Sequence, residues 1–407
     1  MDLSFGEALL IFGSLLALTA ALSGLIRGTV LSASVLSITL GIVLAELDVV
    51  SVDFGDTGIV ELIELALILT LVSDGLLVDR ELLGRHWGPP ARALVFAMPI
   101  TLLLLALGAK LLFGDLTWAE SFLLGAVLCA TDPVVTSAVV TSKAVPASIR
   151  HTLNLESGLN DGLALPFVLF FLVLASPGGD AGREAAQLVG EAAFGAVVGV
   201  ALGLLGGWLH RVVPGGVTAR YEGIYAIGFG LAAFGLADVT FGNGLIAAFV
   251  LGITLGISEH EITERFVIFS ENVSAIFQVL TFFIFGALIV ATGYDGPIPA
   301  LLLFIAFALA VARPVAVELS LAGTRMPRPH KAFIAWFGPK GVASMLFALL
   351  VLDATVAHGT LVFDIASFVI LASIIAHGLT DTVGARWIAR RMGAEDEPPG
   401  DVPGSLL

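Results

Sequence analysis

The chain has 407 residues, of which 57% are hydrophobic and only 13% are charged, and its mean hydropathy is +1.01. A soluble domain is closer to half apolar and a quarter charged, so this composition excludes an ordinary soluble enzyme or binding module. The net charge of −15 comes without any basic cluster that would indicate a nucleic-acid partner, and the single cysteine, Cys129, excludes an intramolecular disulfide.

Apolar runs of about 20 residues recur along the whole chain, which predicts an all-α polytopic membrane protein. The first run has no basic segment before it and no cleavage site, so we expect a mature span rather than a signal peptide. Short loops with glycine and proline separate the runs. The thirteen predicted spans are 5–26, 29–47, 58–78, 93–113, 117–140, 149–175, 186–210, 220–239, 243–257, 263–292, 298–321, 331–353 and 361–388.

Lysine and arginine are distributed unequally between the two sides of these spans. With an external N-terminus, the cytoplasmic loops and the C-terminal tail hold Arg27, Arg80, Arg85, Arg92, Lys143, Arg150, Arg211, Arg220, Arg265, Arg325, Arg328, Lys331, Arg386, Arg390 and Arg391. The external side holds only Lys110 and Arg183, while Arg313 and Lys340 lie inside spans. This asymmetry follows the positive-inside rule and predicts a multi-pass protein of the cell (inner) membrane, with its N-terminus outside and its C-terminus in the cytoplasm.

The predicted spans divide into six, one and six. Two six-span units joined by one extra span must have opposite orientations, which is the arrangement of an inverted repeat. We therefore expect a first repeat over residues 1–178, a linking seventh span over 179–215 and a second repeat over 216–392. The remaining residues, 393–407, are acidic and rich in proline and glycine, which predicts a short disordered tail.

The fifth and twelfth predicted spans carry matching interruptions. Ala130-Thr-Asp-Pro133 and Phe337-Gly-Pro-Lys-Gly341 each place a proline in mid-span beside a charged residue. Proline removes a backbone donor and clashes with the preceding turn, so both helices should break there. A break exposes positive N-terminal and negative C-terminal helix ends, which Asp132 and Lys340 are suited to compensate. The alternative is that both prolines merely kink packed helices.

The sixth predicted span contains four polar residues within two helical turns, in the segment Glu156-Ser-Gly-Leu-Asn-Asp-Gly162. Asp161 lies near the middle of that span, and an ionisable group at such a depth marks a functional site by default. Ser157 lies one helical turn before Asp161 and shares its face. Asn160 points to a neighbouring face, where it can bridge to the unwound backbone of Thr131-Asp132. These oxygen donors suit a small hard cation such as Na⁺ or Li⁺, or K⁺, and no His/Cys cluster indicates a transition metal.

These motifs together resemble those of the monovalent cation:proton antiporters of the NhaP type, relatives of the animal Na⁺/H⁺ exchangers. Four segments carry the resemblance in the family's order, namely Thr131-Asp-Pro133, Glu156–Gly162, Ala312-Arg-Pro314 and Gly338-Pro-Lys-Gly-Val-Ala343. The resemblance extends over all the predicted spans. It implies thirteen transmembrane helices in two inverted six-helix repeats with crossed broken helices. It also implies a homodimer and an elevator-like movement of a six-helix core against a dimer domain.

The resemblance implies roles for the polar residues of the fifth and sixth spans. Asp161 corresponds to the ion- and proton-binding aspartate of the family, and Asn160 to its partner, which marks the electroneutral branch. Ser157 and Thr131 correspond to positions that help coordinate the ion, the threonine through its backbone carbonyl. The resemblance therefore implies a Na⁺ site at Asp161, Ser157 and Thr131.

Further charged residues have alternative roles. Asp74 corresponds to an acidic position that reaches the ion through water, or else it lies on an ordinary polar face. Asp132 is either a structural group or a direct ligand. Glu156 and Arg313 correspond to a structural ion pair. Lys340 replaces the arginine that is usual in the family. Because a buried lysine can lose its proton and arginine cannot, Lys340 is an alternative second proton carrier.

The expected function is a secondary antiporter that exchanges Na⁺ or Li⁺ for H⁺, because one carboxylate with two mutually exclusive occupants couples the two movements. If Asp161 alone titrates, exchange is one for one and electroneutral. The alternatives are a K⁺/H⁺ antiporter, an electrogenic exchanger through Lys340, and a cation channel, although nothing resembles a carbonyl filter loop. We expect no enzyme and no cofactor, since the sequence contains no nucleophile–base set, metal cluster or nucleotide loop.

Overall fold

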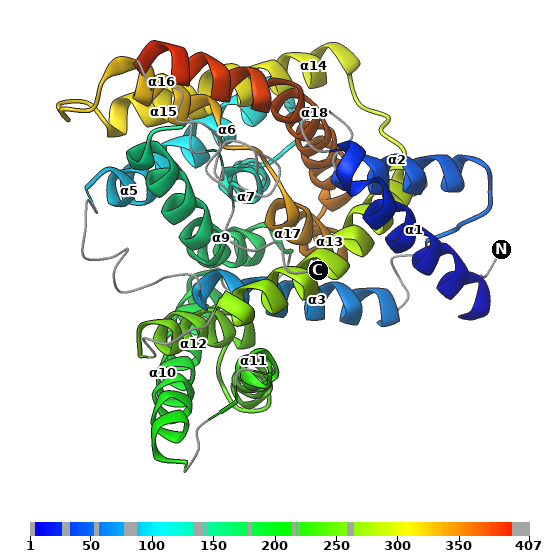
Figure 1. Ribbon diagram of the computed structural model, residues 1–407. Coiled ribbons are helices and arrows are strands. Elements are labelled where there is room, and N and C mark those ends of the chain that lie inside the picture. Colours follow the sequence, from blue (N-terminus) through cyan, green and yellow to red (C-terminus); the bar gives the residue numbers. More distant parts are fainter. Residues whose placement is uncertain are drawn as a thin grey trace.

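The computed structural model describes residues 5–26, 33–52, 57–76, 88–132, 142, 145–177, 181–213, 217–218, 220–258 and 264–392. Every regular element within these ranges is a helix, which confirms the all-α prediction (Figure 1). Several sequence predictions lie outside the described residues. They concern Pro133, the cations Arg27, Arg80, Arg85 and Lys143, and the acidic tail.

The helices follow the predicted apolar runs closely. Their bounds are α1 Phe5–Ile26, α2 Ala33–Glu46, α3 Thr57–Leu76, α5 Gly88–Arg92, η1 Ala93–Ala97, α6 Met98–Leu112, α7 Trp118–Cys129, α9 Ala147–Ala175, α10 Ala181–Val212, α11 Glu222–Asp238, α12 Gly244–Ser258, α13 Glu264–Thr292, α14 Ile298–Phe307, η3 Ala308–Ala312, α15 Arg313–Ser320, α16 Arg328–Trp336, α17 Val342–Asp353 and α18 Gly359–Met392. Within the described residues, each predicted span overlaps one helix or consecutive helices, and residues 133–140 of the fifth predicted span lie outside the description.

Length and composition support a membrane-spanning fold. Within the described ranges, six continuous helical segments are long and apolar enough to cross a bilayer, namely Gly88–Leu112, Ser148–Ala175, Gly182–Val212, Ala275–Thr292, Ile298–Ser320 and Gly359–Arg391. Several other helices are apolar but shorter. That all thirteen predicted spans cross the membrane, and do so as two inverted repeats, stays a prediction.

Two helices contain a π-helical turn at matching places. The turn η1 comes directly before Met98-Pro99, and η3 comes directly before Arg313-Pro314. Proline cannot donate to the helix ladder and its ring crowds the preceding turn, and an inserted residue is a common way to relieve this. The two segments also pack together, because α15 contacts η1 and α6 contacts η3. The fourth and eleventh predicted spans therefore share the same irregularity.

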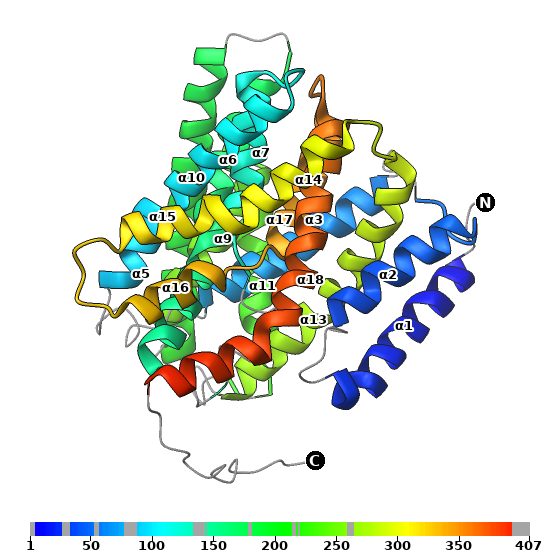
Figure 2. The same ribbon diagram turned by 90° about the horizontal axis from the view of Figure 1, so that it is seen from above.

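The helices form two groups that meet at α9 and α17. One group consists of α1–α3 and α10–α13, and the other of α5–α9 and α14–α18. Helices α9 and α17 belong to the second group but also contact α3 of the first. Figure 1 shows α7 and α17 side by side near the middle of the molecule. In Figure 2, α14 and α15 follow one another along one line, and α16 lies beside α15. The polar residues predicted for the site lie on the elements at this junction.

Glycines allow α10 to pack closely on α12. A methyl group added at Gly195, Gly199 or Gly203 would overlap atoms of α12 or of the residue before it, Asn243. Small residues of this kind let two helix backbones approach each other in membrane proteins. The sequence leaves open whether this glycine-rich face packs inside the chain or forms a dimer surface, and the structure places these three glycines against α12 of the same chain.

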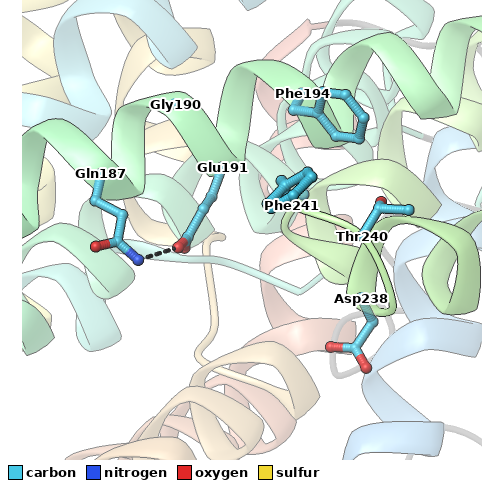
Figure 3. Close-up of a pocket in the computed structure, with 8 residues that line it drawn as sticks. Gln187, Gly190, Glu191, Phe194, Asp238, Thr240 and Phe241 are labelled. Carbon is cyan, nitrogen blue, oxygen red and sulfur yellow. Dashed lines mark hydrogen bonds between the residues drawn. The ribbon is translucent and has the colours of Figure 1, made fainter.

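A pocket of about 730 Å³ lies at one end of α10, beside the connection between α11 and α12. Figure 3 shows its lining residues, with Gln187 donating to Glu191 at 2.8 Å. The others are Gly190, Phe194, Asp238, Thr240, Phe241 and Gly242. None of the residues predicted for ion binding lines it, so this pocket is separate from the predicted site.

Candidate ion-binding site

The predicted site residues are buried although they are polar. Thr131, Asp132, Glu156, Ser157, Asn160, Asp161, Arg313 and Lys340 are only 1–6% exposed. Asp74 is half-buried, but its Oδ2 atom is fully enclosed. Burying a charge is costly unless it is paired or hydrogen-bonded, so the partners of these groups decide what the arrangement can do.

The first predicted break begins where α7 ends. The helix stops at Cys129, and Ala130 has an extended backbone, with φ −62° and ψ 148°. Asp132 then donates its backbone N–H to the carbonyl oxygen of Pro339, at 2.9 Å, in the twelfth predicted span. The unwound residues of one half of the chain therefore pair directly with those of the other half.

The second predicted break is described completely and is confirmed. Helix α16 ends at Trp336, residues 337–341 are not helical, and α17 begins at Val342. The carboxylate of Asp132 accepts a hydrogen bond from the Val342 N–H at 3.0 Å, at the start of α17. The ammonium of Lys340 donates to the Ala130 carbonyl at 3.3 Å, at the end of α7. Each charge faces the helix end that its sign was expected to compensate.

Two glycines make this close packing sterically feasible. A methyl group at Gly341 would overlap the Asp132 carboxylate, and one at Gly338 would overlap the Arg313 guanidinium. Both glycines lie in the unwound segment between α16 and α17. This segment therefore passes between two charged side chains that leave no room for a Cβ atom.

On α9, the Asn160 side chain holds the first break at one point. Its amide nitrogen donates to the hydroxyl oxygen of Thr131 at 2.9 Å. We expected a bridge to the backbone of Thr131-Asp132, and the structure corrects this, because the acceptor is the threonine side chain. The backbone N–H of Asp132 is already used in its bond to Pro339. The side-chain N–H of Asn160 needs an acceptor, and the Thr131 hydroxyl offers one.

Within the described part of the chain, three enclosed oxygens near this point have no hydrogen-bond partner, namely Oδ1 of Asp161, Oδ1 of Asn160 and Oδ2 of Asp74. Helix α3 approaches α9 here, since a Cβ at Gly158 would lie 3.8 Å from the carbonyl oxygen of Asp74. Buried acceptors without a donor are unfavourable. A bound cation would relieve this cost at each oxygen that it contacted, and a proton would relieve it at either carboxylate.

The predicted pair of Glu156 and Arg313 is present. The guanidinium Nη1 lies 2.7 Å from Oε1 of Glu156, and Nη2 donates to the carbonyl of Ile334 at 3.3 Å. This carbonyl lies in the last turn of α16, where helix carbonyls lack partners within the helix. The pair joins α9 to the second break, and its charges cancel within the buried cluster.

Comparison with known proteins identifies the family. The profile of the family described as sodium/hydrogen exchanger, transmembrane, matches residues 13–384. The chain belongs to this family. The resemblance to NhaP-type antiporters is thereby confirmed, and relatives of known name agree with it.

Two curated relatives of this exchanger-family chain are named as potassium/proton antiporters. NhaP of Alkalimonas amylolytica is 25% identical over 83% of this chain and 59% of its own length. NhaP2 of Shewanella oneidensis is 28% identical over 77% of this chain and 54% of its own length. The chain thus spans little more than half the length of these relatives. A Na⁺/H⁺ antiporter of Schizosaccharomyces pombe is 27% identical over 82% of this chain and 79% of its own.

A solved structure shares the fold of this family member. It is that of the sodium proton antiporter MjNhaP1 from Methanocaldococcus jannaschii, with a TM-score of 0.73 and 22% sequence identity, covering 94% of this chain and 97% of that chain. At this identity the likeness concerns the fold alone. It agrees with the all-helical architecture predicted from the sequence.

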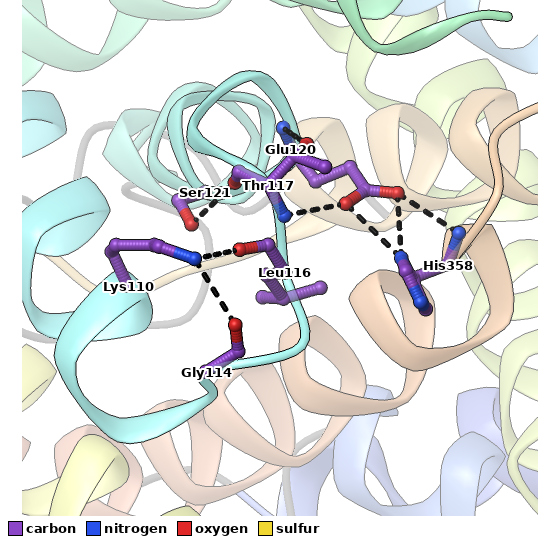
Figure 4. A network of polar contacts seen from close by, with 7 residues as sticks. All are labelled: Lys110, Gly114, Leu116, Thr117, Glu120, Ser121 and His358. Carbon is purple, nitrogen blue, oxygen red and sulfur yellow. Dashed lines mark hydrogen bonds and ion pairs between the residues drawn. The ribbon is translucent and has the colours of Figure 1, made fainter.

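Sequence reasoning missed a polar network at the start of α7 in this exchanger-family chain. Glu120 and Thr117 form a capping box, and Glu120 also accepts hydrogen bonds from the backbone N–H of His358 at 2.9 Å (Figure 4). The His358 ring lies 3.0 Å from the same carboxylate. Lys110, near the end of α6, donates to the carbonyls of Gly114 and Leu116 in the loop that leads to α7. The Thr-x-x-Glu spacing is a sequence signal for the cap, but nothing local points to His358.

Two further buried groups were also missed. His377 and Ser373 on α18 contact the second break, and their spacing of four residues in an apolar span is a signal that could have found them. Asp364, near the start of α18, is buried, at 4% exposure, and accepts a hydrogen bond from Thr292 at 2.6 Å. That contact joins α18 to α13.

Proposed function

We propose that this exchanger-family member is a secondary antiporter that moves Na⁺ or Li⁺ in one direction and H⁺ in the other. The observation that carries the proposal is the enclosed Oδ1 of Asp161, on a buried helix face, for which the described residues offer no hydrogen-bond partner. A proton or a cation neutralises this carboxylate, but both cannot occupy it together. An empty, charged carboxylate resists movement through an apolar barrier, so the two ions exchange rather than leak.

The ligand set supports a hard monovalent cation. In this proposal Asp161, Ser157 and Thr131 bind Na⁺, with Thr131 acting through its backbone carbonyl, and Asp74 reaches the ion through water. Oxygen atoms are the ligands that such cations prefer. Asn160 holds the first break in place through its bond to Thr131. Asp132, whose carboxylate is occupied by Val342, has the structural role.

Charge balance supports electroneutral exchange. The Glu156–Arg313 pair cancels, and Asp132 and Lys340 compensate helix ends of opposite sign. If Asp74 keeps one protonation state through the cycle, Asp161 carries the charge that its occupant must balance, and one proton replaces one cation. In the electrogenic alternative, Lys340 releases a second proton in each cycle. Its full burial and its contact with a neutral carbonyl motivate that alternative.

A second candidate substrate is K⁺. The curated names of the relatives from Alkalimonas and Shewanella specify K⁺/H⁺ antiport, whereas the Schizosaccharomyces relative is named for Na⁺. The same carboxylate and hydroxyl oxygens would bind either ion. We favour Na⁺ because the few protein oxygens at Asp161, Ser157 and Thr131 suit the smaller ion.

At the level of the whole fold, we propose thirteen spans in two inverted repeats, residues 1–178 and 216–392, joined by the linking span 179–215. The matching π-helical turns before Pro99 and Pro314 support this, because they occur in the fourth span of each half. We further propose a homodimer in the cell membrane with an external N-terminus and a cytoplasmic C-terminus. The six-span group that contains α9 and α17 would then move against the group that contains α3.

Purified protein in proteoliposomes tests the antiport proposal. With a preset pH gradient, adding Na⁺ should dissipate the gradient, and Asp161→Asn should abolish the response. Asp364→Asn is the matched control, because Asp364 is a buried aspartate that is bonded to Thr292. Full activity of Asp161→Asn would contradict the proposal. Apparent affinities for Li⁺, Na⁺ and K⁺ at several pH values then separate the two candidate substrates, and competition predicts that each apparent KM rises as the pH falls.

A further inference from the structure

A buried histidine lies beside the second break, and the proposed transport cycle does not use it. His377 on α18 is 2% exposed. Its Nε2 lies 2.8 Å from the carbonyl oxygen of Trp336, the last residue of α16. The two rings also pack together, with centroids 5.3 Å apart and planes inclined by 36°. His377 therefore binds the C-terminal end of the helix that precedes the break.

The proton on the Nε2 atom of His377 can be assigned from its partner. A carbonyl oxygen only accepts hydrogen bonds, so the contact with Trp336 requires an N–H at Nε2. The other nitrogen, Nδ1, lies 3.2 Å from the Ser373 hydroxyl and 2.7 Å from the Ser373 carbonyl. A doubly protonated ring donates to both carbonyls, whereas a neutral ring with its proton on Nε2 donates to Trp336 and accepts from the Ser373 hydroxyl. In both of these states the bond to Trp336 is kept.

Ser373 extends this contact across the break. Its hydroxyl oxygen accepts a hydrogen bond from the backbone N–H of Lys340 at 2.9 Å. Helix α18 therefore holds the unwound chain at two points, the Trp336 carbonyl before Phe337-Gly-Pro339 and the Lys340 amide after it. Together, these two hydrogen bonds fix the position of the Lys340 backbone, from which its side chain extends toward Ala130.

We propose that Ser373 and His377 are positioning residues that place the Lys340 ammonium against the Ala130 carbonyl. The importance of these two residues for transport rests on the proposed antiport function. Their positioning of Lys340 does not depend on that function. The first half of the chain has a counterpart, because Asn160 on the sixth span binds Thr131 in the first break. In each half, the span that follows the broken span supplies the polar side chain that holds the break.

The single cysteine of the chain offers a direct readout of this positioning. Cys129 is buried, at 1% exposure, and directly precedes Ala130, whose carbonyl receives the Lys340 ammonium. In the native protein it should react slowly with a membrane-permeant maleimide. If the clamp holds the two breaks together, Ser373→Ala and His377→Leu should each raise the labelling rate by about 10-fold, the effect of one lost buried hydrogen bond.

A conservative variant separates positioning from simple packing. In His377→Gln, the amide nitrogen can donate to the Trp336 carbonyl and the amide oxygen can accept from Ser373, so slow labelling and transport should both be retained. Thr380→Val is the matched control, because it removes a hydrogen bond from Trp336 to α18 that does not reach Lys340. Its labelling rate should equal that of the native protein.

A double-mutant cycle completes the test. Since Ser373 and His377 act on the same segment, the double variant Ser373→Ala/His377→Leu should label no faster than the faster single variant. Additive effects, or equal labelling of His377→Leu and Thr380→Val, would overturn the proposal. Because labelling needs no transport, a clamp without antiport activity would contradict the proposed function and leave the positioning role supported.

Discussion

The Asp132 carboxylate accepts a hydrogen bond from the backbone N–H of Val342 at 3.0 Å, so a residue of the first break caps the helix that follows the second. In the opposite direction, the Lys340 ammonium in the second break donates to the Ala130 carbonyl at the end of α7. Within the described residues, each break therefore supplies a charge to a helix end at the other break. We expect damage to one break to disturb the other, and the following predictions test this and related contacts.

Adding one methyl group at Gly341 should disrupt both breaks. In Gly341→Ala the new Cβ would overlap the Asp132 carboxylate, and overpacking of this kind costs about 1–3 kcal/mol. We expect a lower unfolding temperature in detergent and at least a tenfold loss of transport rate. Gly235→Ala in α11 is the control, since a Cβ there has open space, and it should be neutral or stabilising. Equal behaviour of the two variants would refute the steric argument.

Removing one partner of the Glu156–Arg313 pair should lower the free energy of unfolding more than removing both charges. Arg313→Met leaves a buried, uncompensated carboxylate, which destabilises by about 3–5 kcal/mol. The double variant Glu156→Gln/Arg313→Met removes both charges and should recover part of that loss. Chemical unfolding of the purified protein in detergent measures both. A double variant less stable than Arg313→Met would show that the pair does more than cancel charge.

Glu120 should contribute to stability without taking part in ion binding. Glu120→Ala removes one half of the capping box and leaves the His358 amide without its acceptor, so we expect a loss of about 1–3 kcal/mol in the free energy of unfolding. The apparent KM for the transported cation should stay unchanged in proteoliposomes. A shift in KM with unchanged stability would mean that this network reaches the ion site.

The effect of membrane potential tests the alternative role of Lys340. If Asp161 alone exchanges its proton, the transport rate should not change when a potassium diffusion potential is imposed with valinomycin. A clear dependence on potential would implicate Lys340 as a second proton carrier. In that case Lys340→Arg should remove the dependence, because arginine keeps its charge throughout the cycle.

Much of the fold could be predicted because apolar runs report helices directly. The runs at 5–26 and 149–175 match α1 and α9 to within two residues, since the change from apolar to polar residues coincides with the helix ends. The break at Phe337–Gly341 was predictable because proline, glycine and a charge interrupt an apolar run there. The Glu156–Arg313 pair came from a family resemblance, and the structure brings these two groups to 2.7 Å.

The rest depends on contacts that local patterns do not contain. His358 reaches Glu120 across 238 positions of the chain, and nothing around either residue signals that contact. Ser373 and His377 stand out only as polar residues in an apolar helix, and their partners, Lys340 and Trp336, follow from three-dimensional packing. The π-helical turns were missed because one extra residue leaves a uniformly apolar stretch unchanged in composition.

The turn Ala308–Ala312 sets the rotational phase of the helix after it. An α-helix turns by about 100° per residue, so one extra residue re-aims every later side chain by that angle. Deleting a single alanine from this turn would restore regular α-helical pairing and swing Arg313 away from Glu156. An in-frame loss of one codon, which leaves every charged residue in the sequence, would then behave like the loss of the arginine itself.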